Sequence, residues 1–543
     1  MMTKVKSTDL TPGDFSIPRV NPYMWRRRRR AFKLWGPVVA ILLACVLIAA
    51  AAWALMKPED RAERVALMGE AETAERLAWK SLQAKPSDIK AWVQFIDLHA
   101  ELKAPDEEEV LPQHRGVDDD EVRRLLASVK DRNVATLASY WFETTLTTTK
   151  ADPAAVVALA DKQPPARMAN YILGRAAQKD EDWVTSARRF EREGLAFNDQ
   201  DNLDVALRVW VHNKAWDELR ARSKDPRYRK AFDIRFRLEL AEHDRDWPTI
   251  LRYVWIVSYI DLHVWPVFLA ILNAVLWFLL ATRLGRLGDG VRGRPFIYAI
   301  AFLLGIASIY PTGILITIED MLGFVEDGQP VRDAIYYVFG VGLREELCKL
   351  LLFLPLLPAL KRRGSRIEAM TAGALVGLGF AADENLGYFR ELAAGAALAR
   401  FLTANFLHMG LTSLVALSVY DASRGRSTPR DAFNVIFPLV IGIHGAYDFF
   451  LSSPQFSGLS LVSMMLLVIV TRAFLRQLLI ASSTMEQEGV LRLLVASVAL
   501  LTGVSYIYAT TLVGPFIAIR LVALGVIGAA VMLWVFVREL GTA

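Results

Sequence analysis

Seven ionisable residues lie within segments that are otherwise apolar enough to cross a lipid bilayer. A charged group at the centre of a membrane helix costs roughly 2.5–3.5 kcal/mol, so ionisable residues there usually serve ions, protons or catalysis. Their distribution over four successive apolar segments predicts one shared polar site. The seven residues are Glu345, Glu346, Lys349, Glu384, His408, His444 and Asp448.

The spacing of these residues indicates which of them share a helix face. Lys349 follows Glu345 by four residues and Glu346 by three, so its ammonium group can reach either carboxylate. The two glutamates diverge by about 100° around a helix, so one can face a site while the other supports the residues of that site. His444 and Asp448 are four apart and share a face. Taken alone, the Glu-Glu-x-x-Lys motif also fits a purely structural ion pair.

The formal charge of this set constrains its chemistry. Four carboxylates and one lysine leave −3 when both histidines are neutral. Because a low-dielectric site does not retain that excess, carboxylates must share protons or a cation must bind. Either outcome suits hydrolysis, since a carboxylate can deprotonate water and a divalent metal can lower the pKa of water. The sequence has no HExxH motif and no cysteine cluster, so glutamate-type and metal-dependent chemistry both stay open.

The elements that must position these residues are membrane helices. The chain has 543 residues, of which 53% are hydrophobic, and its charged residues concentrate between 57 and 255. Runs of about 20 apolar residues span the hydrocarbon layer. We expect an all-α, polytopic bundle of about ten spans, at roughly 34–56, 261–282, 296–318, 335–359, 367–389, 400–420, 432–452, 457–480, 489–511 and 514–537.

The predicted domain organisation follows from these spans. A basic cytoplasmic tail (1–33) precedes a first anchor (34–56), which we interpret as retained because its apolar run is longer than a signal-peptide core. A charged domain (57–255) follows, then a membrane core (261–480) and additional C-terminal spans (489–537).

Basic residues predict the orientation of the chain. The positive-inside rule places both termini in the cytoplasm and residues 57–255 outside it. The seven ionisable residues then fall in the outer half of the bilayer. The overall charge of +5 reflects loop arginines and does not indicate nucleic-acid binding. The basic clusters are Arg26 to Arg30, then Arg283, Arg286, Arg292 and Arg294, then Lys361, Arg362, Arg363 and Arg366, then Arg424, Arg426 and Arg430, and finally Arg472 and Arg476.

Residues 57–255 show helical spacing and three similar turns. Each turn is polar and ends in a tryptophan, at Trp183, Trp216 and Trp247. These intervals approach the 34-residue period of tetratricopeptide helix hairpins, whose stacks form concave surfaces that bind protein partners. We therefore predict a tetratricopeptide-like repeat domain, with a generic helical domain as the alternative.

The order of the membrane motifs resembles the PrsW family of intramembrane proteases, which is related to the type II CAAX prenyl endopeptidases and the Abi group. The motifs are Glu345-Glu346-x-x-Lys349, Phe380-x-x-x-Glu384-Asn385, His408 and His444-x-x-x-Asp448.

The resemblance implies hydrolysis of a membrane-protein substrate, such as a membrane-anchored anti-sigma-type regulator, in the bacterial inner membrane. It implies that Glu345 or Glu346 activates water and that Glu384 and Asp448 orient the histidines. It also implies a metal or oxyanion role for His408 and His444, with Phe380 and Asn385 in support. A metal in this site would be Zn²⁺ or another divalent ion held by His408, His444 and Glu384, and a mechanism without metal is the alternative.

Two other classes of protein fit parts of the pattern. A proton-coupled transporter also lines a cavity with carboxylates and histidines, but transporters commonly show internal repeats, which are not evident in this sequence. A non-catalytic scaffold would use the repeat domain alone and would not need the ionisable set.

Overall fold

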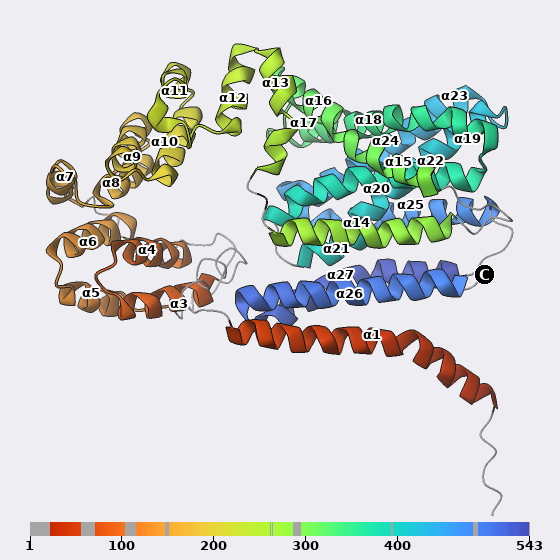
Figure 1. Cartoon of the computed structure of the whole chain (residues 1–543), viewed down its shortest axis with the longest axis horizontal. Coiled ribbons are helices and arrows are strands. Elements are labelled where there is room, and N and C mark those ends of the chain that lie inside the picture. The colour runs from red at the N-terminus through yellow and green to blue at the C-terminus, as the bar shows by residue number, and fades with distance from the viewer. Residues whose placement is uncertain are drawn as a thin grey trace, which may run out of the picture.

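The computed structural model describes residues 22–55, 71–103, 116–146, 151–260, 262, 264–285, 295–391, 395–481 and 487–541. All regular structure in these residues is helical, which confirms the predicted all-α class. An N-terminal helical domain lies at one end of a bundle of long helices (Figure 1). Residues 1–21 of the predicted basic tail, and the loop with Arg286, Arg292 and Arg294, lie outside the described residues.

The N-terminal domain follows helix α1 (Pro22–Leu55). Its elements are α3 (Ala71–Ala84), α4 (Ile89–Lys103), α5 (Asp119–Ser128), α6 (Arg132–Leu146), α7 (Ala154–Ala160), α8 (Ala169–Lys179), α9 (Trp183–Phe197), α10 (Gln200–His212), α11 (Trp216–Ser223), η2 (Pro226–Tyr228), α12 (Ile234–Asp244), α13 (Trp247–Tyr253) and η3 (Ile256–Tyr259).

The bundle follows from Val264 onward. Its elements are α14 (Val264–Leu284), α15 (Pro295–Ala307), α16 (Ile309–Met321), α17 (Pro330–Ile335), η4 (Tyr336–Gly342), α18 (Leu343–Phe353), η5 (Leu354–Leu356), α19 (Leu357–Arg363), α20 (Arg366–Glu391), α21 (Gly395–Leu402), α22 (Ala404–Ser423), α23 (Pro429–Asp431), η6 (Ala432–Ile436), α24 (Phe437–Ser452), η7 (Pro454–Leu459), α25 (Ser460–Ala481), α26 (Gln487–Val513) and α27 (Pro515–Gly541).

Within the described residues, six helices are long and apolar enough to cross a membrane, which makes this a multi-pass membrane protein. The four other predicted spans are also helical. The apolar part of α1 covers only Gly36–Ala52, α27 is bent by 43°, and α18 and α20 carry the ionisable residues that lower their hydropathy. The six helices are Val264–Leu284, Pro295–Met321, Ala397–Ser423, Ala432–Ser452, Ser460–Ile480 and Gly489–Val513.

The three turns that look alike in sequence share one backbone geometry. Glu181, Lys214 and Arg245 adopt left-handed φ values of 57°, 52° and 55°. In each turn the next residue donates its N–H to a carbonyl five residues back, which is the Schellman closure of a helix. The domain therefore contains three similar helix hairpins, α8–α9, α10–α11 and α12–α13. Its comparison with tetratricopeptide repeats stays a prediction.

Stacking connects successive hairpins. The Trp183 ring lies 4.2 Å from the His212 ring, and Trp216 lies 4.5 Å from His243. Each tryptophan begins the second helix of one hairpin, and each histidine lies near the end of the first helix of the next. The repeated turn and the repeated ring contact thus propagate together along the domain.

The helical domain contacts the bundle at two separate places. One apolar cluster joins its first helices to Leu512 and Ala518, beside the α26–α27 turn. Another joins Leu238 and Val254 to Ile314 on α16, where Tyr310 Oη also donates to the Leu251 carbonyl at 3.0 Å. The domain is therefore anchored to the bundle at both of its ends (Figure 1).

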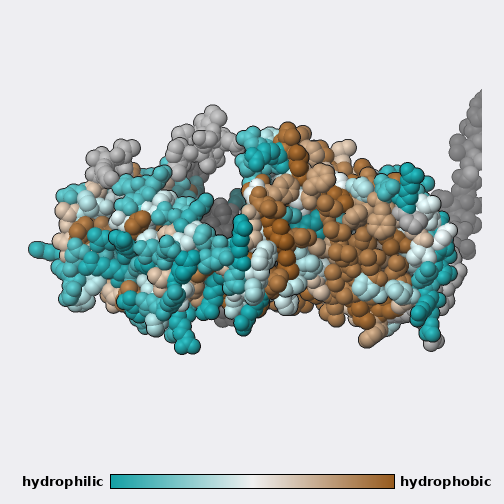
Figure 2. All heavy atoms as spheres, turned by 90° about the horizontal axis from the view of Figure 1, so that it is seen from above, coloured by the Kyte–Doolittle hydropathy of each residue, from teal (hydrophilic) through white to brown (hydrophobic). Residues whose placement is uncertain are grey.

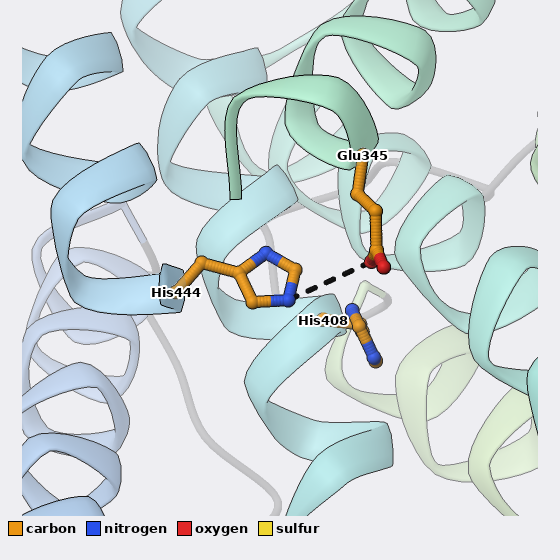
Figure 3. Close-up of side chains that lie close together, drawn as sticks. All are labelled: Glu345, His408 and His444. Carbon is orange, nitrogen blue, oxygen red and sulfur yellow. Dashed lines mark ion pairs between the residues drawn. The ribbon is translucent and has the colours of Figure 1, made fainter. Parts of the chain in front are cut away.

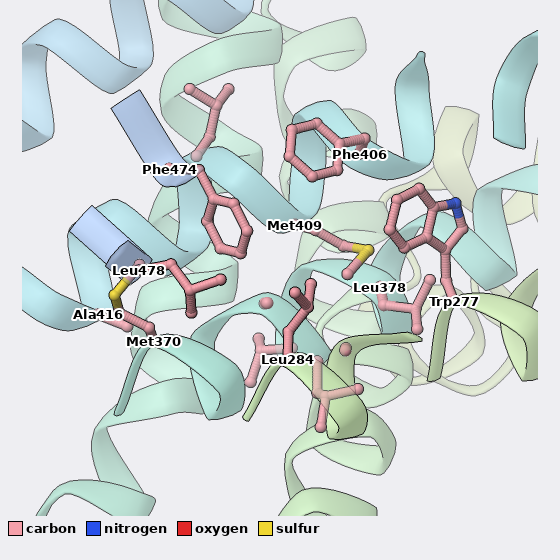
Figure 4. Packing of buried hydrophobic residues seen from close by; sticks show 14 of the residues in the cluster. Trp277, Leu284, Met370, Leu378, Phe406, Met409, Ala416, Phe474 and Leu478 are labelled. Carbon is pink, nitrogen blue, oxygen red and sulfur yellow. The ribbon is translucent and has the colours of Figure 1, made fainter. Parts of the chain in front are cut away.

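The core of the bundle is centred on α20 and α22. Trp277 of α14 and Phe474 of α25 pack around Phe406 and Met409 of α22 (Figure 4). Close approach of the backbones depends on a glycine, because a Cβ on Gly377 would lie 2.3 Å from the His408 carbonyl oxygen. This contact brings the His408 segment against α20.

A second glycine contact brings α24 against the segment before the Glu-Glu motif. A Cβ on Gly445 would lie 2.5 Å from the Tyr337 carbonyl oxygen. Tyr337 belongs to η4, a π-helical stretch that runs directly into α18. Stretches of π-helix inside longer helices occur frequently at functional sites. Glu345 and His444 are thereby placed on facing helices.

Candidate active site

Lys349 lies at the centre of the ionisable residues and is fully buried. Its Nζ atom is 3.2 Å from Glu345 Oε2, 2.9 Å from Glu346 Oε1 and 2.8 Å from His408 Nδ1. It also lies 3.9 Å from the centre of the Phe380 ring, a cation–π contact. The three residues of α18 therefore meet His408 of α22 through one ammonium group, and Phe380 supports that group from α20.

The hydrogen bonds of His408 define its tautomer. An ammonium group has three donors and no acceptor, so the His408 Nδ1 atom accepts from Lys349. The other ring nitrogen, Nε2, then carries the proton and donates to Glu384 Oε2 at 3.0 Å. Glu384 thus contacts the His408 ring on the side away from Lys349.

His444 lies among three carboxylates. Its Nδ1 atom is 2.9 Å from Glu346 Oε1, and its Nε2 atom is 3.3 Å from Asp448 Oδ2. The same Nε2 atom is 3.6 Å from Glu345 Oε2 (Figure 3). Glu346 Oε2 accepts from the Thr412 hydroxyl at 3.3 Å. Both oxygens of the buried Glu346 are therefore engaged, which leaves Glu345 as the member of the pair that faces both histidines.

The structure adds a cation, Arg400, to the seven ionisable residues predicted from the sequence. Arg400 of α21 donates from Nη2 to Glu384 Oε2 at 2.6 Å and from Nε to Asn385 Oδ1 at 2.6 Å. Asn385 also donates to Asn405 Oδ1 at 2.8 Å. The available signal was the position of Arg400 at the start of an apolar segment, eight residues before His408.

Arg400 changes the charge balance of the site. Glu345, Glu346, Glu384 and Asp448 now face two fixed cations, Lys349 and Arg400, which leaves a formal charge of −2 with neutral histidines. A divalent cation would neutralise that remainder.

The residues fit a divalent metal ion. Glu345, His408 and His444 each offer a ligand atom, and these atoms lie within 4.8 Å of one another. Two histidines and one carboxylate form a common donor set of catalytic zinc sites. The second nitrogen of each histidine meets a carboxylate, Glu384 or Glu346, and this arrangement is typical of metal-binding histidines.

This group differs in one member from the ligand set implied by the motifs, which contained Glu384. Glu384 Oε2 contacts Arg400 and His408 Nε2, whereas His408 Nδ1 faces Lys349 and thus the Glu345 side of the ring. Glu345 therefore takes the place of Glu384 in the group that could hold an ion.

The site is enclosed but not sealed. The side chains of Glu346 and Lys349 are inaccessible, whereas Glu384 and Asp448 are 23% and 26% exposed. The opening lies on the side where α20 and α24 carry these two carboxylates.

The fold and the site together define a multi-pass α-helical membrane protein with a buried centre of histidines and glutamates that suits a metallohydrolase. Residues 294–474, a third of the chain, match the family model of the PrsW family intramembrane metalloproteases. The match confirms the resemblance predicted from the motifs, and it contains every residue of the site. Among the curated proteins and the solved structures, no match was found.

Proposed function

We propose that this protein is an intramembrane endopeptidase that hydrolyses a peptide bond of a membrane-protein substrate. One observation carries the proposal. Within the matched segment, four helices bring seven ionisable residues together at one buried centre. Buried charges in membrane helices are expensive and are usually retained for function.

Each residue has a role that follows from its contacts. Glu345 is placed to polarise and deprotonate the attacking water, because it faces both histidines while both oxygens of Glu346 are engaged. Glu346 holds His444, and Glu384 holds His408. Lys349 offers positive charge beside Glu345, where it can stabilise an oxyanion. Asp448, near His444 Nε2, orients that ring.

In the metal-dependent alternative, Glu345, His408 and His444 would hold a divalent ion, Zn²⁺ or another. Glu345 would then be a ligand and not the base, and His408 Nδ1 would bind the ion in place of its hydrogen bond from Lys349. Bound there, a zinc ion would lower the pKa of a water ligand to about 7 and act as a Lewis acid toward the scissile carbonyl.

We propose the finer topology from the charge pattern of the loops. The chain would cross the bacterial inner membrane ten times, with both termini in the cytoplasm and residues 57–255 outside it. The site would then lie in the outer half of the bilayer. The proposed substrate is a single-pass membrane regulator of the anti-sigma type, cleaved in the outer half of the bilayer.

The helical domain would recruit or gate the substrate. Support comes from its two contacts with the bundle, which hold it over one end of the membrane helices (Figure 1). Deleting residues 60–250 while retaining the first anchor is expected to reduce cleavage of the native substrate. Unchanged cleavage by the deletion variant would exclude this role.

The proposed activity is tested by comparative membrane proteomics of N-termini. Cells that express the wild-type chain are compared with cells that express Glu345→Gln, Glu346→Gln or His444→Ala at matched levels. Cys348→Ala serves as the control, because this buried thiol lies beside the motif and has no role in the proposed chemistry. We expect a membrane-protein fragment in wild type and in the control that is absent from the other variants. If no N-terminus differs, the protease assignment is wrong.

A further inference from the structure

The segment from Trp247 to Tyr259 presents an apolar face that neither the helical domain nor the bundle covers. Trp247, Leu251 and Trp255 are 40%, 41% and 44% exposed. Their spacing of four residues places them on one side of a helix, and Ile256 beside them is also exposed. Large apolar side chains gathered in this way mark an interaction surface.

Neighbouring residues of the same segment hold it against the bundle. Ile250 and Val254 are buried in the apolar cluster that includes Ile314 and Met321 of α16. Val254 packs against Gly313, where a Cβ would lie 3.3 Å from Val254 Cγ2. The segment is therefore fixed against α16, while Trp247, Leu251 and Trp255 beside these contacts stay exposed.

The exposed face is continuous with the lipid-facing surface of the bundle. Trp255 and Tyr259 line a groove of about 500 Å³ together with Ile271 and Val275 of the membrane helix α14. Ile271 lies seven residues inside that helix, which corresponds to about 10 Å along its axis. The groove that Trp255 lines therefore extends along a helix that is apolar enough to cross the membrane.

The direction of the segment agrees with this position. Figure 1 shows α13 running across the direction of α14 and α26, which is parallel to the plane of a membrane that these helices cross. Figure 2 shows hydrophobic surface beginning at the boundary between the helical domain and the bundle.

The polar side-chain atoms of Trp255 and Tyr259 form hydrogen bonds within the protein. Trp255 Nε1 donates to the Tyr259 hydroxyl at 2.9 Å, and that hydroxyl donates to Asp383 on α20. Burying an unpaired N–H or O–H group in lipid is unfavourable. These two hydrogen bonds remove that cost and tie the segment to the helix that carries Glu384.

We propose that residues 247–259 form an interfacial membrane segment whose partner is the lipid leaflet on the side of the helical domain. Amphipathic helices of this kind bury their apolar face at the boundary of headgroups and acyl chains, where tryptophan and tyrosine are enriched. The segment sets the edge of the helical domain at the membrane surface beside α14 and α20. This inference does not depend on the proposed protease activity.

Site-directed spin labelling tests the inference on the full chain. The protein has two cysteines, Cys45 and Cys348, and both are buried, so alanine at these positions leaves a clean background. A nitroxide is attached through Leu251→Cys, and through Leu195→Cys on α9 as a matched apolar control that is also exposed. The protein is reconstituted in phosphatidylcholine and phosphatidylglycerol vesicles, and collision with oxygen and with a water-soluble nickel chelate is measured.

We expect the label at position 251 to collide several-fold more with oxygen than with nickel, and the control label to show the opposite preference. Nickel access at position 251 equal to that of the control would show a water-facing surface and overturn the proposal. Exclusion of both reagents would show that protein covers the face and would also overturn it. Ile256→Cys provides a second labelling position if Leu251→Cys does not fold.

Discussion

Arg400 and Glu384 form an ion pair at the edge of the candidate active site. Nη2 of Arg400 lies 2.6 Å from Oε2 of Glu384, and the same oxygen accepts from His408 Nε2 at 3.0 Å. The arginine therefore acts on His408 only through the carboxylate that both groups share. Asn385 accepts a second hydrogen bond from Arg400, which fixes the plane of the guanidinium group.

This relationship predicts a specific result in a double-mutant cycle. Arg400→Gln and Glu384→Gln should each lower cleavage by about 10–100-fold, as is typical for residues that orient metal-site ligands. The double variant should cleave no more slowly than Glu384→Gln alone, because Arg400 acts on His408 only through Glu384. The measurement is the single-turnover cleavage rate at matched protein levels.

Arg344→Gln is the matched control for this cycle. Arg344 is also a buried cation, but it pairs with Glu319 rather than with Glu384. A multiplicative loss in the Arg400→Gln/Glu384→Gln variant would show that Arg400 acts independently of Glu384 and would contradict the prediction.

Metal content distinguishes the two chemistries that the residues allow. The purified wild-type protein should retain a divalent ion after desalting, and His408→Ala, His444→Ala and Glu345→Ala should each lose it. The reason is that these three residues supply the converging ligand atoms. Inductively coupled plasma mass spectrometry gives the stoichiometry.

The control for metal content is His243→Ala, which removes a histidine that stacks on Trp216 in the helical domain. A chelator should abolish cleavage, and added Zn²⁺ should restore it. Full activity of metal-free protein would instead favour the glutamate mechanism.

Close packing at Gly377 predicts a position-dependent effect of alanine within one helix. A methyl group at this position meets the His408 carbonyl, and overpacking of this kind costs about 1–3 kcal/mol. Gly377→Ala should lower the thermal unfolding temperature and impair cleavage, because it pushes His408 away from α20.

Gly387→Ala is the natural comparison, since Gly387 lies on the same helix and a Cβ there meets nothing within 4 Å. It should leave stability unchanged or raise it by up to about 1 kcal/mol through helix propensity. Both variants are measured by thermal unfolding in the same detergent. Equal effects of the two substitutions would refute the packing argument.

The contact between α12 and α16 should weaken as pH rises. Burial and the nearby carboxylates of Glu239 and Asp320 raise the pKa of Glu242 from 4.5 to about 7. A raised carboxyl pKa favours the neutral folded state, so this stabilisation is complete below about pH 4.5 and is lost as pH rises through about 7. Glu242 accepts from Thr317 on α16 at 3.3 Å, so the loss should loosen this junction.

Hydrogen exchange, corrected for the intrinsic rate at each pH, measures the loosening as reduced protection of α12 amides. Glu242→Gln should abolish the pH dependence, and Glu181→Gln on an exposed turn should leave it intact. Persistence of the same pH dependence in Glu242→Gln would assign it to another group.

The amino-acid sequence by itself determined which residues are out of place in an apolar environment and which of them share a helix. The contacts of Lys349 with Glu345 and Glu346, and that of His444 with Asp448, follow from the helical period alone. Local repetition also predicted the three tryptophan turns, because their geometry depends on a few consecutive residues.

Tertiary structure alone decided the contacts between helices. Arg400 lies 16 residues beyond Glu384, and nothing in a one-dimensional pattern states that α21 turns back to present its guanidinium group to α20. Whether Glu345 or Glu384 faces both histidines depends on how the helices are rotated and how closely they cross, which is set by glycine contacts such as Gly377. Helical periodicity fixes a residue's direction within its own helix, whereas the partner it meets depends on packing between helices far apart in the chain.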